Sequence, residues 1–148
     1  MKIYELKKIT AAEARPHRQE ILRKGQPVET VIYPKDDAPE SVHFAIEKDG
    51  KVLAITTLLN DPFPVTGETA AWRMRGVATY PQARRKGYGS ILIQACIDHA
   101  RSQGGKVIWC NARIGALDFY FSSGFLQHGK PFDIPGAGEH YRLYLPLE

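Results

Sequence analysis

The strongest constraint on the fold is a glycine-containing turn that joins a predicted strand to a predicted helix. The turn reads Arg84-Arg85-Lys86-Gly87-Tyr88-Gly89. Residues 71–79 before it read as a strand, which Pro81 ends. After the turn, apolar residues at positions 92, 93, 96, 97 and 100 recur at helical spacing. A strand that feeds into a helix in this way places the turn at the centre of an α/β pattern.

The remaining predicted elements extend this pattern. Further strands are predicted at residues 2–8, 42–47, 51–58 and 106–111, near residue 125, and at 141–147; further helices are predicted at 11–24 and 116–122. Loops are predicted at 26–41, 60–68 and 131–138. The order β-α-β-β-β-α-β-α-β-β predicts a mixed α/β sheet. A chain of 148 residues without repeats or linkers is expected to form one domain, residues 1–148.

Two local patterns indicate a helix start and a hairpin turn in the first half of the chain. Thr10 followed by Glu13 forms a capping-box pattern at a helix start. Pro16 interrupts that helix, which favours either a start after Pro16 or two separate pieces. Lys48-Asp49-Gly50 between two β-rich runs predicts a hairpin.

Composition excludes several classes of function. The net charge of +4 allows an anionic ligand, but there is no basic arm and no RNA-binding aromatic signature, so nucleic acid is not expected. No window approaches the length of a membrane span, and the start of the chain lacks the apolar stretch of a signal peptide. Cys96 and Cys110 fall in apolar runs without metal-site spacing, so neither a metal nor a disulfide is expected. A cytoplasmic protein is the simplest interpretation.

The chemistry of the turn points to a phosphate ligand. The first turn of a helix has free backbone N–H groups, and glycines let an oxygen approach them closely. A diphosphate fits there, and the basic residues 84–86 would attract it. The chain has no GxxxxGK[ST] string, and the third residue after Gly89 is Leu92 rather than a third glycine. A helix start without any ligand stays the plain alternative.

Three motifs together resemble the GCN5-related N-acetyltransferase superfamily. Arg84-x-x-Gly87-x-Gly89 matches its R/Q-x-x-G-x-G/A hallmark, and Arg75-Gly76-Val77-Ala78-Thr79 is similar to its bulged fourth strand. The segment from Ala112 to Phe125, with Phe119-Tyr120 and Gly124-Phe125, is similar to its A…FY…GF segment. The resemblance covers about residues 42–147. It implies an acyl-CoA N-acyltransferase fold, with a mainly antiparallel sheet splayed between strands four and five and flanked by helices.

The resemblance also implies residue roles. Acetyl-coenzyme A would be the co-substrate, without a metal, and Tyr120 would be the general acid that protonates the departing thiolate. The implied coenzyme A-binding residues are Val77, Ala78, Thr79, Arg84, Arg85, Lys86, Gly87, Tyr88, Gly89, Ser90 and Asn111. From the residues alone, Tyr120 could be a core aromatic and Asn111 a helix cap.

The acceptor side is less defined by the sequence. Strand 71–79 contains no carboxylate, so the candidate general bases are His140 and Glu139, with Glu68 as a weaker one. Arg73 and Arg75 lie two apart on one strand face, which suggests binding of a carboxylate or phosphate on the acceptor. The plain alternative is a solvated strand edge.

The sequence therefore predicts a cytoplasmic N-acetyltransferase that acts by direct attack of an amine on acetyl-coenzyme A. The acceptor is a small-molecule or peptide amine that the sequence does not identify. Similar proteins are commonly homodimers, so a homodimer is a further expectation. The alternative from another class is a non-catalytic acyl-CoA binding or sensing module on the same fold.

Overall fold

The structure is a computed structural model that describes residues 3–147, and it confirms the mixed α/β fold. Seven strands are hydrogen-bonded in the order β1-β2-β3-β4-β5-β7-β6. The strands are β1 (Glu5–Ile9), β2 (Val42–Lys48), β3 (Lys51–Asn60), β4 (Ala71–Thr79), β5 (Val107–Arg113), β6 (Leu126–Ile134) and β7 (Gly138–Pro146). The helices are α1 (Ala11–Leu22), α2 (Tyr88–Ser102) and α3 (Leu117–Phe121), with short 3₁₀ turns at Val28–Val31, Pro81–Ala83 and Ile114–Ala116.

The residues group into two compact units. The first unit is drawn from Met1–Leu59 and Met74–Cys96, and the second from Asn60–Arg73 and Ile97–Glu148. Strand β4 and helix α2 each contribute residues to both units. That the whole chain is one folding domain stays a prediction.

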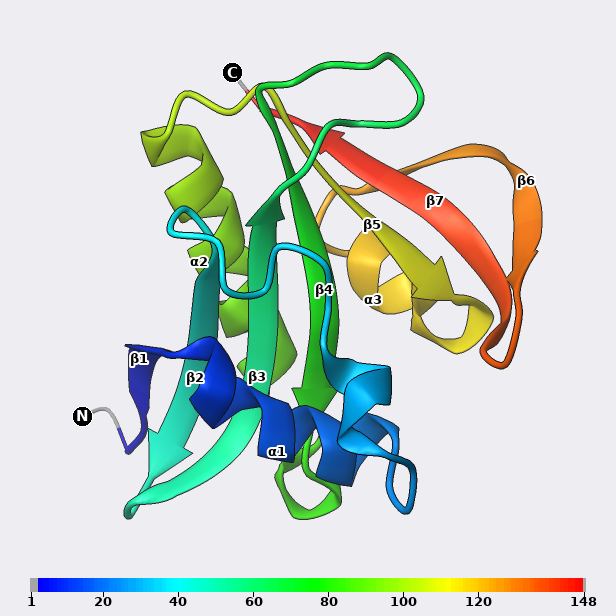
Figure 1. Ribbon diagram of the computed structural model, residues 1–148. Helices are drawn as coiled ribbons and strands as arrows, with labels where there is room; N and C mark the ends of the chain where they lie inside the picture. Colours follow the sequence, from blue (N-terminus) through cyan, green and yellow to red (C-terminus); the bar gives the residue numbers. More distant parts are fainter. Residues whose placement is uncertain (1–2, 148) are drawn as a thin grey trace. The chain divides into compact units, whose positions relative to one another are not determined.

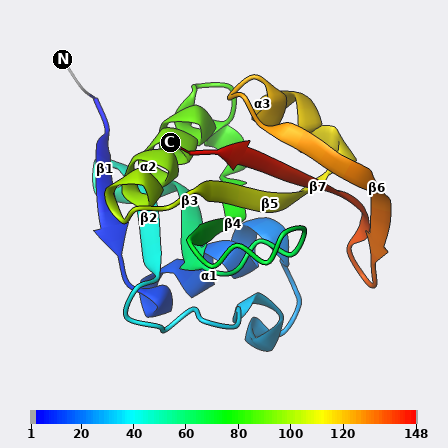
Figure 2. The same cartoon turned by 90° about the horizontal axis from the view of Figure 1, so that it is seen from above.

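The first unit packs its helices on the two faces of β2, β3 and β4. Helix α1 lies across one face of β2 and β3 (Figure 1), and the first part of α2 lies on the opposite side of these strands (Figure 2). Ala45, Ile55 and Ala78 form a buried cluster, against which Ile21 and Leu22 of α1 pack. Apolar burial of this kind is the main force that holds a helix onto a sheet.

Helix α1 begins as predicted but does not break at its proline. Thr10 Oγ1 accepts a hydrogen bond from the Glu13 N–H at 3.1 Å, and Glu13 Oε1 accepts one from the Thr10 N–H at 2.9 Å. This capping box is the predicted one. The expected start after Pro16, or a division into two pieces, is wrong, because one helix runs continuously from Ala11 to Leu22. Pro16 is the sixth residue of the helix, and its missing N–H removes one hydrogen bond, to the Ala12 carbonyl, without ending the helix.

The predicted hairpin is confirmed. Strands β2 and β3 pair antiparallel, with Lys48 opposite Lys51. Asp49 and Gly50 have φ angles of 53° and 76°. Two successive left-handed residues make the turn type whose twist matches that of the flanking strands, which is why Asp-Gly is favoured there.

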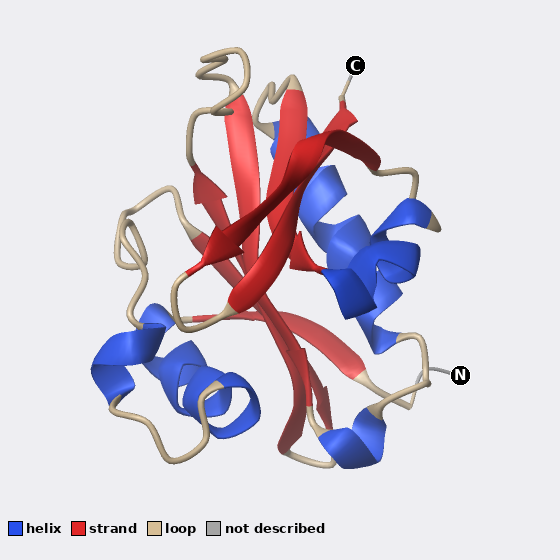
Figure 3. Cartoon of the chain, turned by 90° about the vertical axis from the view of Figure 1, so that its right-hand side faces the viewer, coloured by secondary structure: helices blue, strands red, loops and turns tan. Residues whose placement is uncertain are grey.

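The second unit is built on an antiparallel ribbon of β5, β7 and β6 (Figure 3). Strands β4 and β5 run parallel, and their register joins Ala71–Arg73 to Val107–Trp109. In the described chain this ladder covers only three pairs, in agreement with the predicted splay between strands four and five. Phe63, Ala71, Val107 and Trp109 form a buried cluster on one face of the ribbon.

The C-terminal strands differ from their prediction. The loop expected at 131–138 is wrong, because β6 continues to Ile134 and β7 begins at Gly138. The register of β6 with β7 is irregular between His128 and Phe132, and Pro131 lies inside that irregularity. A proline is tolerated there because its missing N–H faces no ladder partner. The first strand is also shifted, to Glu5–Ile9; Lys2, where it was predicted to begin, lies outside the described residues.

Candidate active site

The turn before α2 presents backbone N–H groups in a left-handed conformation. Arg85 and Gly87 have φ angles of 63° and 82°. The Gly87 carbonyl accepts the first helical hydrogen bond, from the Ile91 N–H at 3.2 Å. The N–H groups of Tyr88, Gly89 and Ser90 therefore precede the first intrahelical bond, as at any helix start. A Cβ at Gly87 would meet no atom within 4 Å, so this side of the turn is open to a ligand.

Side chains around the turn hold it in place. Tyr88 is buried and packs edge-on against Tyr4, with ring centroids 5.6 Å apart. Arg84 Nε donates to the Thr79 carbonyl at 3.2 Å, which ties the turn to the end of β4. Arg85 and Lys86 are exposed. The residues predicted for the turn, 84–90, are thus brought together at one helix N-terminus, where the helix dipole also favours an anion.

The end of β4 alternates between core and half-buried positions. Ala78 is buried in the core cluster, whereas Val77 and Thr79 are half-buried. Gly76 has a φ of 68°, and a Cβ there would lie 3.0 Å from Tyr33 Oη and 3.5 Å from Arg18 Nε. This left-handed residue inside a strand is consistent with the predicted bulge. Glycine is favoured here, because any other residue would need both the left-handed φ and a shift of the Tyr33 side chain.

Tyr120 lies in α3 and contacts the thiol of Cys110 on β5. Its side chain is buried between Phe119 and Phe125, with ring centroids 5.1 Å and 5.5 Å away. Burial raises the pKa of Cys110 to about 12, and the nearby Arg73 and the hydrogen bond with Tyr120 only partly offset it. Burial also raises the pKa of Cys96. Both cysteines are therefore neutral thiols near neutral pH, and neither is an activated nucleophile.

The two predicted bases on β7 have different surroundings. His140 is buried, and its Nδ1 lies 2.8 Å from the Gly138 carbonyl. A carbonyl oxygen only accepts, so Nδ1 donates in this contact and Nε2 is the ring nitrogen left for another partner. Glu139 is exposed and accepts a hydrogen bond from the Tyr141 hydroxyl at 3.0 Å. Alternation along β7 places Glu139 on the opposite face from His140. Glu68, the weaker candidate, accepts from the Ala70 N–H and lies 3.8 Å from Lys106 Nζ.

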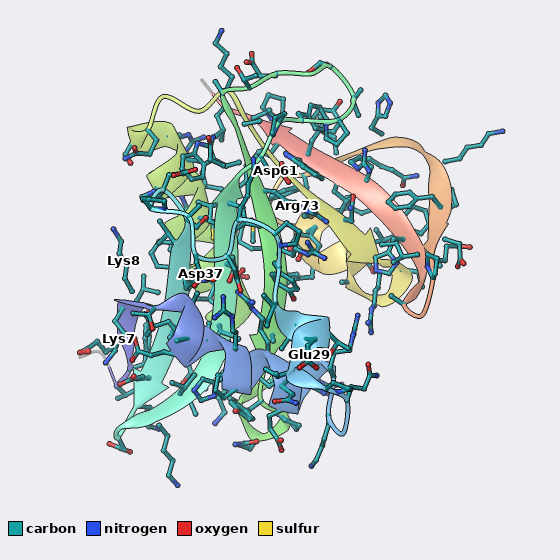
Figure 4. All side chains as sticks on the ribbon, viewed as in Figure 1. Lys7, Lys8, Glu29, Asp37, Asp61 and Arg73 are labelled. Atoms are coloured by element: carbon teal, nitrogen blue, oxygen red, sulfur yellow. The ribbon has the colours of Figure 1, made fainter. Side chains whose placement is uncertain are left out.

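The two arginines of β4 stack on different aromatic rings. Arg75 lies over the Tyr33 ring, with its guanidinium carbon 4.1 Å from the centroid. Arg73 lies over Trp109 at 4.9 Å, and its Nη1 is 3.8 Å from Asp61 Oδ2 (Figure 4). Neither is the fully solvated side chain of a strand edge, because both are half-buried.

Asn111 is paired with an arginine that the sequence did not single out. Arg142 of β7 is directly opposite Asn111 of β5 in the register, and its Nε donates to Asn111 Oδ1 at 2.8 Å. Its guanidinium carbon lies 5.4 Å from the Trp109 centroid and 5.2 Å from the Phe132 centroid. Burial lowers the pKa of Arg142. The alternation of Tyr141, Arg142 and Leu143 indicates which face of the strand Arg142 occupies, but it does not identify Asn111 as its partner.

A second arginine cluster, in the first unit, was also missed. Arg18 of α1 is fully buried and donates to both oxygens of Asp36 at 2.7 Å. It also donates to the Val31 carbonyl at 2.7 Å and to Thr57 Oγ1 at 2.6 Å. Burial alone would raise the pKa of Asp36, but the hydrogen bonds and charge of Arg18 lower it on balance. His43 lies beside this pair, and its pKa is lowered by burial.

Two kinds of feature are absent from the part of the chain that the structure describes. Within residues 3–147, no three His, Cys, Asp or Glu side chains gather so that they could hold a metal ion. The helices of the same residues include none with the length and apolar character needed to cross a membrane.

Comparison with known proteins places this geometry in a family. The acetyltransferase (GNAT) family matches residues 4–125. The uncharacterized N-acetyltransferase YitI of Bacillus subtilis (strain 168) is 34% identical over 143 residues, which cover 97% of this chain and 96% of that protein.

Solved structures share the fold at low sequence identity. The ribosomal-protein-S18-alanine N-acetyltransferase of Escherichia coli has a TM-score of 0.74 at 17% identity, covering 97% of this chain and 93% of that one. The protein yncA of Salmonella typhimurium, solved with its cofactor acetyl-CoA, has a TM-score of 0.74 at 16% identity, covering 99% and 95%. From the family match and the Bacillus relative together, the chain belongs to the acetyltransferase (GNAT) family.

Proposed function

We propose that this protein transfers the acetyl group of acetyl-coenzyme A to an amine. The observation that carries the proposal is the open turn before α2, where Gly87 leaves space and the N–H groups of residues 88–90 precede the first helical bond. The backbone amides of residues 85–90 would hold the pyrophosphate, with Arg84, Arg85 and Lys86 as attracting charges. The similar Salmonella protein, solved with acetyl-CoA, supports this choice of co-substrate.

Other coenzyme A contacts are assigned along β4 and β5. The main chain of Val77, Ala78 and Thr79 would pair with the pantetheine arm as an added strand does. The Asn111 amide would reach the same arm through its nitrogen, since its oxygen accepts from Arg142. The reaction would use the cytoplasmic pool of acetyl-coenzyme A, and a homodimer stays a prediction.

The chemical step is a direct acyl transfer. The amine nitrogen attacks the thioester carbonyl carbon, the C–S bond then breaks, and the departing thiolate takes a proton from the Tyr120 hydroxyl. The amine loses its proton to a base, for which His140 Nε2 is proposed because the Gly138 carbonyl fixes the tautomer. Glu139 is the alternative base. The neutral state of Cys110 supports a mechanism without a covalent acyl-enzyme.

On the acceptor side, Arg73 and Arg75 are proposed to attract an acidic group of the amine substrate. Both guanidiniums lie against aromatic rings, which limits their motion and keeps their charge near β4. Small-molecule amines and peptide amines are both candidate acceptors in this proposal.

The test is turnover by Tyr120→Phe, measured as thiol release with an amine panel at saturating acetyl-coenzyme A. We expect kcat to fall about 10²–10⁴-fold, because the leaving thiolate loses its acid, while coenzyme A still raises the melting temperature. Tyr4→Phe, which keeps the ring contact with Tyr88, is the matched control.

Other outcomes of this experiment contradict parts of the proposal. Unchanged kcat in Tyr120→Phe contradicts the general-acid assignment. Stabilisation by coenzyme A without turnover of any amine favours the non-catalytic binding module instead. For the base, His140→Gln should lower kcat/KM about 10²-fold or more; an unchanged kcat/KM removes His140 from the role and makes Glu139→Gln the next variant to test.

A further inference from the structure

The guanidinium of Arg142 is held in a defined orientation within the second unit. Its Nε donates to Asn111 Oδ1 at 2.8 Å, which fixes the inner edge of the group. Trp109 and Phe132 both lie under its central carbon, at 5.4 Å and 5.2 Å from their centroids. Three contacts from strands β5 and β6 therefore restrict a side chain that is otherwise flexible.

This half-buried cation has no carboxylate partner among the described residues. None of the described residues 3–147 forms an ion pair with Arg142, and burial lowers its pKa. The acidic residues of the adjoining strands, Asp133 and Glu139, are opposite each other in the register and on the other face of β7. A buried charge without a counter-charge is costly, so an arginine placed in this way indicates a missing anion.

A second cation lies on the same indole. Arg73 stacks over Trp109 at 4.9 Å, and in the parallel and antiparallel registers Arg73, Trp109 and Tyr144 form one cross-strand row. Asp61 lies beside Arg73 at 3.8 Å and offsets part of its charge. Two guanidiniums around one indole make this face attractive to an anion.

We propose that Arg142 binds a carboxylate of the acceptor, so that the acetylated amine belongs to an amino acid or to a peptide with a free carboxylate. The inference rests on the proposed function, since it names the substrate class of the same reaction. With Nε bound to Asn111, the two Nη groups remain, and they match the two oxygens of a planar carboxylate. Asn111 is then a positioning residue for Arg142.

A purely structural role does not explain the charge. A clamp between β5, β7 and β6 needs only a long side chain that packs on Trp109 and Phe132, and methionine would supply it without burying a cation. The positive face also disfavours polyamines as acceptors, because the second and third ammonium groups would approach Arg73 and Arg142.

The test compares acceptors that differ only in their carboxylate. Wild-type protein is assayed with amino acids and short peptides, each as the free acid, as the C-terminal amide, and as the aminophosphonate analogue. We expect kcat/KM for acids to exceed that for amides about 10-fold or more, because the amide cannot accept a bidentate charged bond. A phosphonate preferred over the carboxylate would overturn the carboxylate assignment.

Variants of Arg142 then locate the preference. Arg142→Gln should raise the KM for acids about 10- to 100-fold relative to the KM for amides, and the amides report any shared effect of releasing Asn111. Arg142→Lys keeps the positive charge but lacks the planar guanidinium, so its KM for acids should lie between those of wild type and Arg142→Gln. Arg101→Gln, at an exposed position of α2 in the same unit, is the matched control. A loss shared equally by acids and amides would indicate a structural role and overturn the proposal.

A binding measurement separates this inference from the proposed function. Titration of the same acids and amides into the protein with coenzyme A reads binding without turnover. Acids that bind to wild type but not to Arg142→Gln support the carboxylate site even if no acceptor is acetylated, in which case the proposed function fails alone. Acetylation of amides and acids at equal rates overturns the inference and leaves the proposed function intact. If Arg142→Gln does not fold, the wild-type preference and Arg142→Lys decide the question.

Discussion

Arg18 in the first unit and Arg142 in the second have similar surroundings and opposite charge balance. Each guanidinium lies over an aromatic ring, Tyr33 for Arg18 and Trp109 for Arg142, and each donates to a neutral side-chain oxygen. Arg18 also holds both oxygens of Asp36, whereas Arg142 has no carboxylate among the described residues.

This difference distinguishes Arg18, which is part of the core, from Arg142, which is proposed to bind a ligand. Arg18 is fully buried and its charge is balanced by Asp36, although its Nε has no hydrogen-bond partner among the described residues. Arg142 is half-buried and keeps two nitrogen groups unused. A buried arginine is thus not a site by itself; the missing counter-charge makes it one.

The largest effect is expected when Asp36 loses its charge. Asp36→Asn leaves the guanidinium of Arg18 buried without a counter-ion and should lower the free energy of unfolding by about 3–5 kcal/mol in urea denaturation. Asp37→Asn is the control, because the Asp37 side chain is 73% exposed and its pairing with Arg15 should contribute at most about 1 kcal/mol.

The double variant Arg18→Met/Asp36→Leu sharpens this prediction. Removing both charges together should cost less than removing Asp36 alone, because no unpaired charge remains. Equal destabilisation by Asp36→Asn and Asp37→Asn would show that Asp36 is not needed as the counter-charge of Arg18, and would contradict the distinction between Arg18 and Arg142.

A smaller effect is expected for Arg142 in the absence of a ligand. Arg142→Met loses one charged hydrogen bond and two ring contacts but also removes an unpaired cation, so we expect the free energy of unfolding to change by no more than about 1 kcal/mol. Urea denaturation of the protein without substrates measures it. A loss as large as that of Asp36→Asn would make Arg142 a structural residue.

The smallest effect is a pH dependence confined to the first unit. Burial lowers the pKa of His43 in the folded state, below its ordinary value of 6.5. The unfolded chain therefore binds more protons below about pH 6.5, and stability present above that pH is lost as the pH falls toward the folded pKa. The urea midpoint should decline between pH 7 and 5, and His43→Gln should flatten part of the decline; His17, whose pKa burial also lowers, contributes the rest. A slope that exposed His128→Gln reduces equally would contradict this assignment.

Local patterns predicted most of the elements, because their signals are carried by neighbouring residues. Strand β4 spans the predicted Ala71–Thr79, and the capping box and the Asp49-Gly50 turn formed as expected. The errors at Pro16 and at 131–138 share a cause. Proline was taken as a break, whereas α1 continues past the one hydrogen bond that Pro16 removes, and Pro131 lies in an irregularity of the β6–β7 register.

The acceptor side could not be predicted because it depends on register. Arg142 and Asn111 are 31 residues apart and meet only because β5 and β7 pair with that alignment. Arg18 and Asp36 are joined through a loop whose path no periodicity specifies. The sequence did indicate the turn residues 84–90, since a helix N-terminus builds its phosphate site from consecutive residues.

The buried thiols have a practical consequence for measuring this protein. Cys96 and Cys110 are both buried, and the pKa of Cys110 is raised to about 12. Thiol-reactive dyes need an accessible thiolate, so they should not react with the folded protein but should react at once with the coenzyme A product. Colour that depends on the acceptor would then report turnover, and a slow rise in protein without acetyl-coenzyme A would report unfolding.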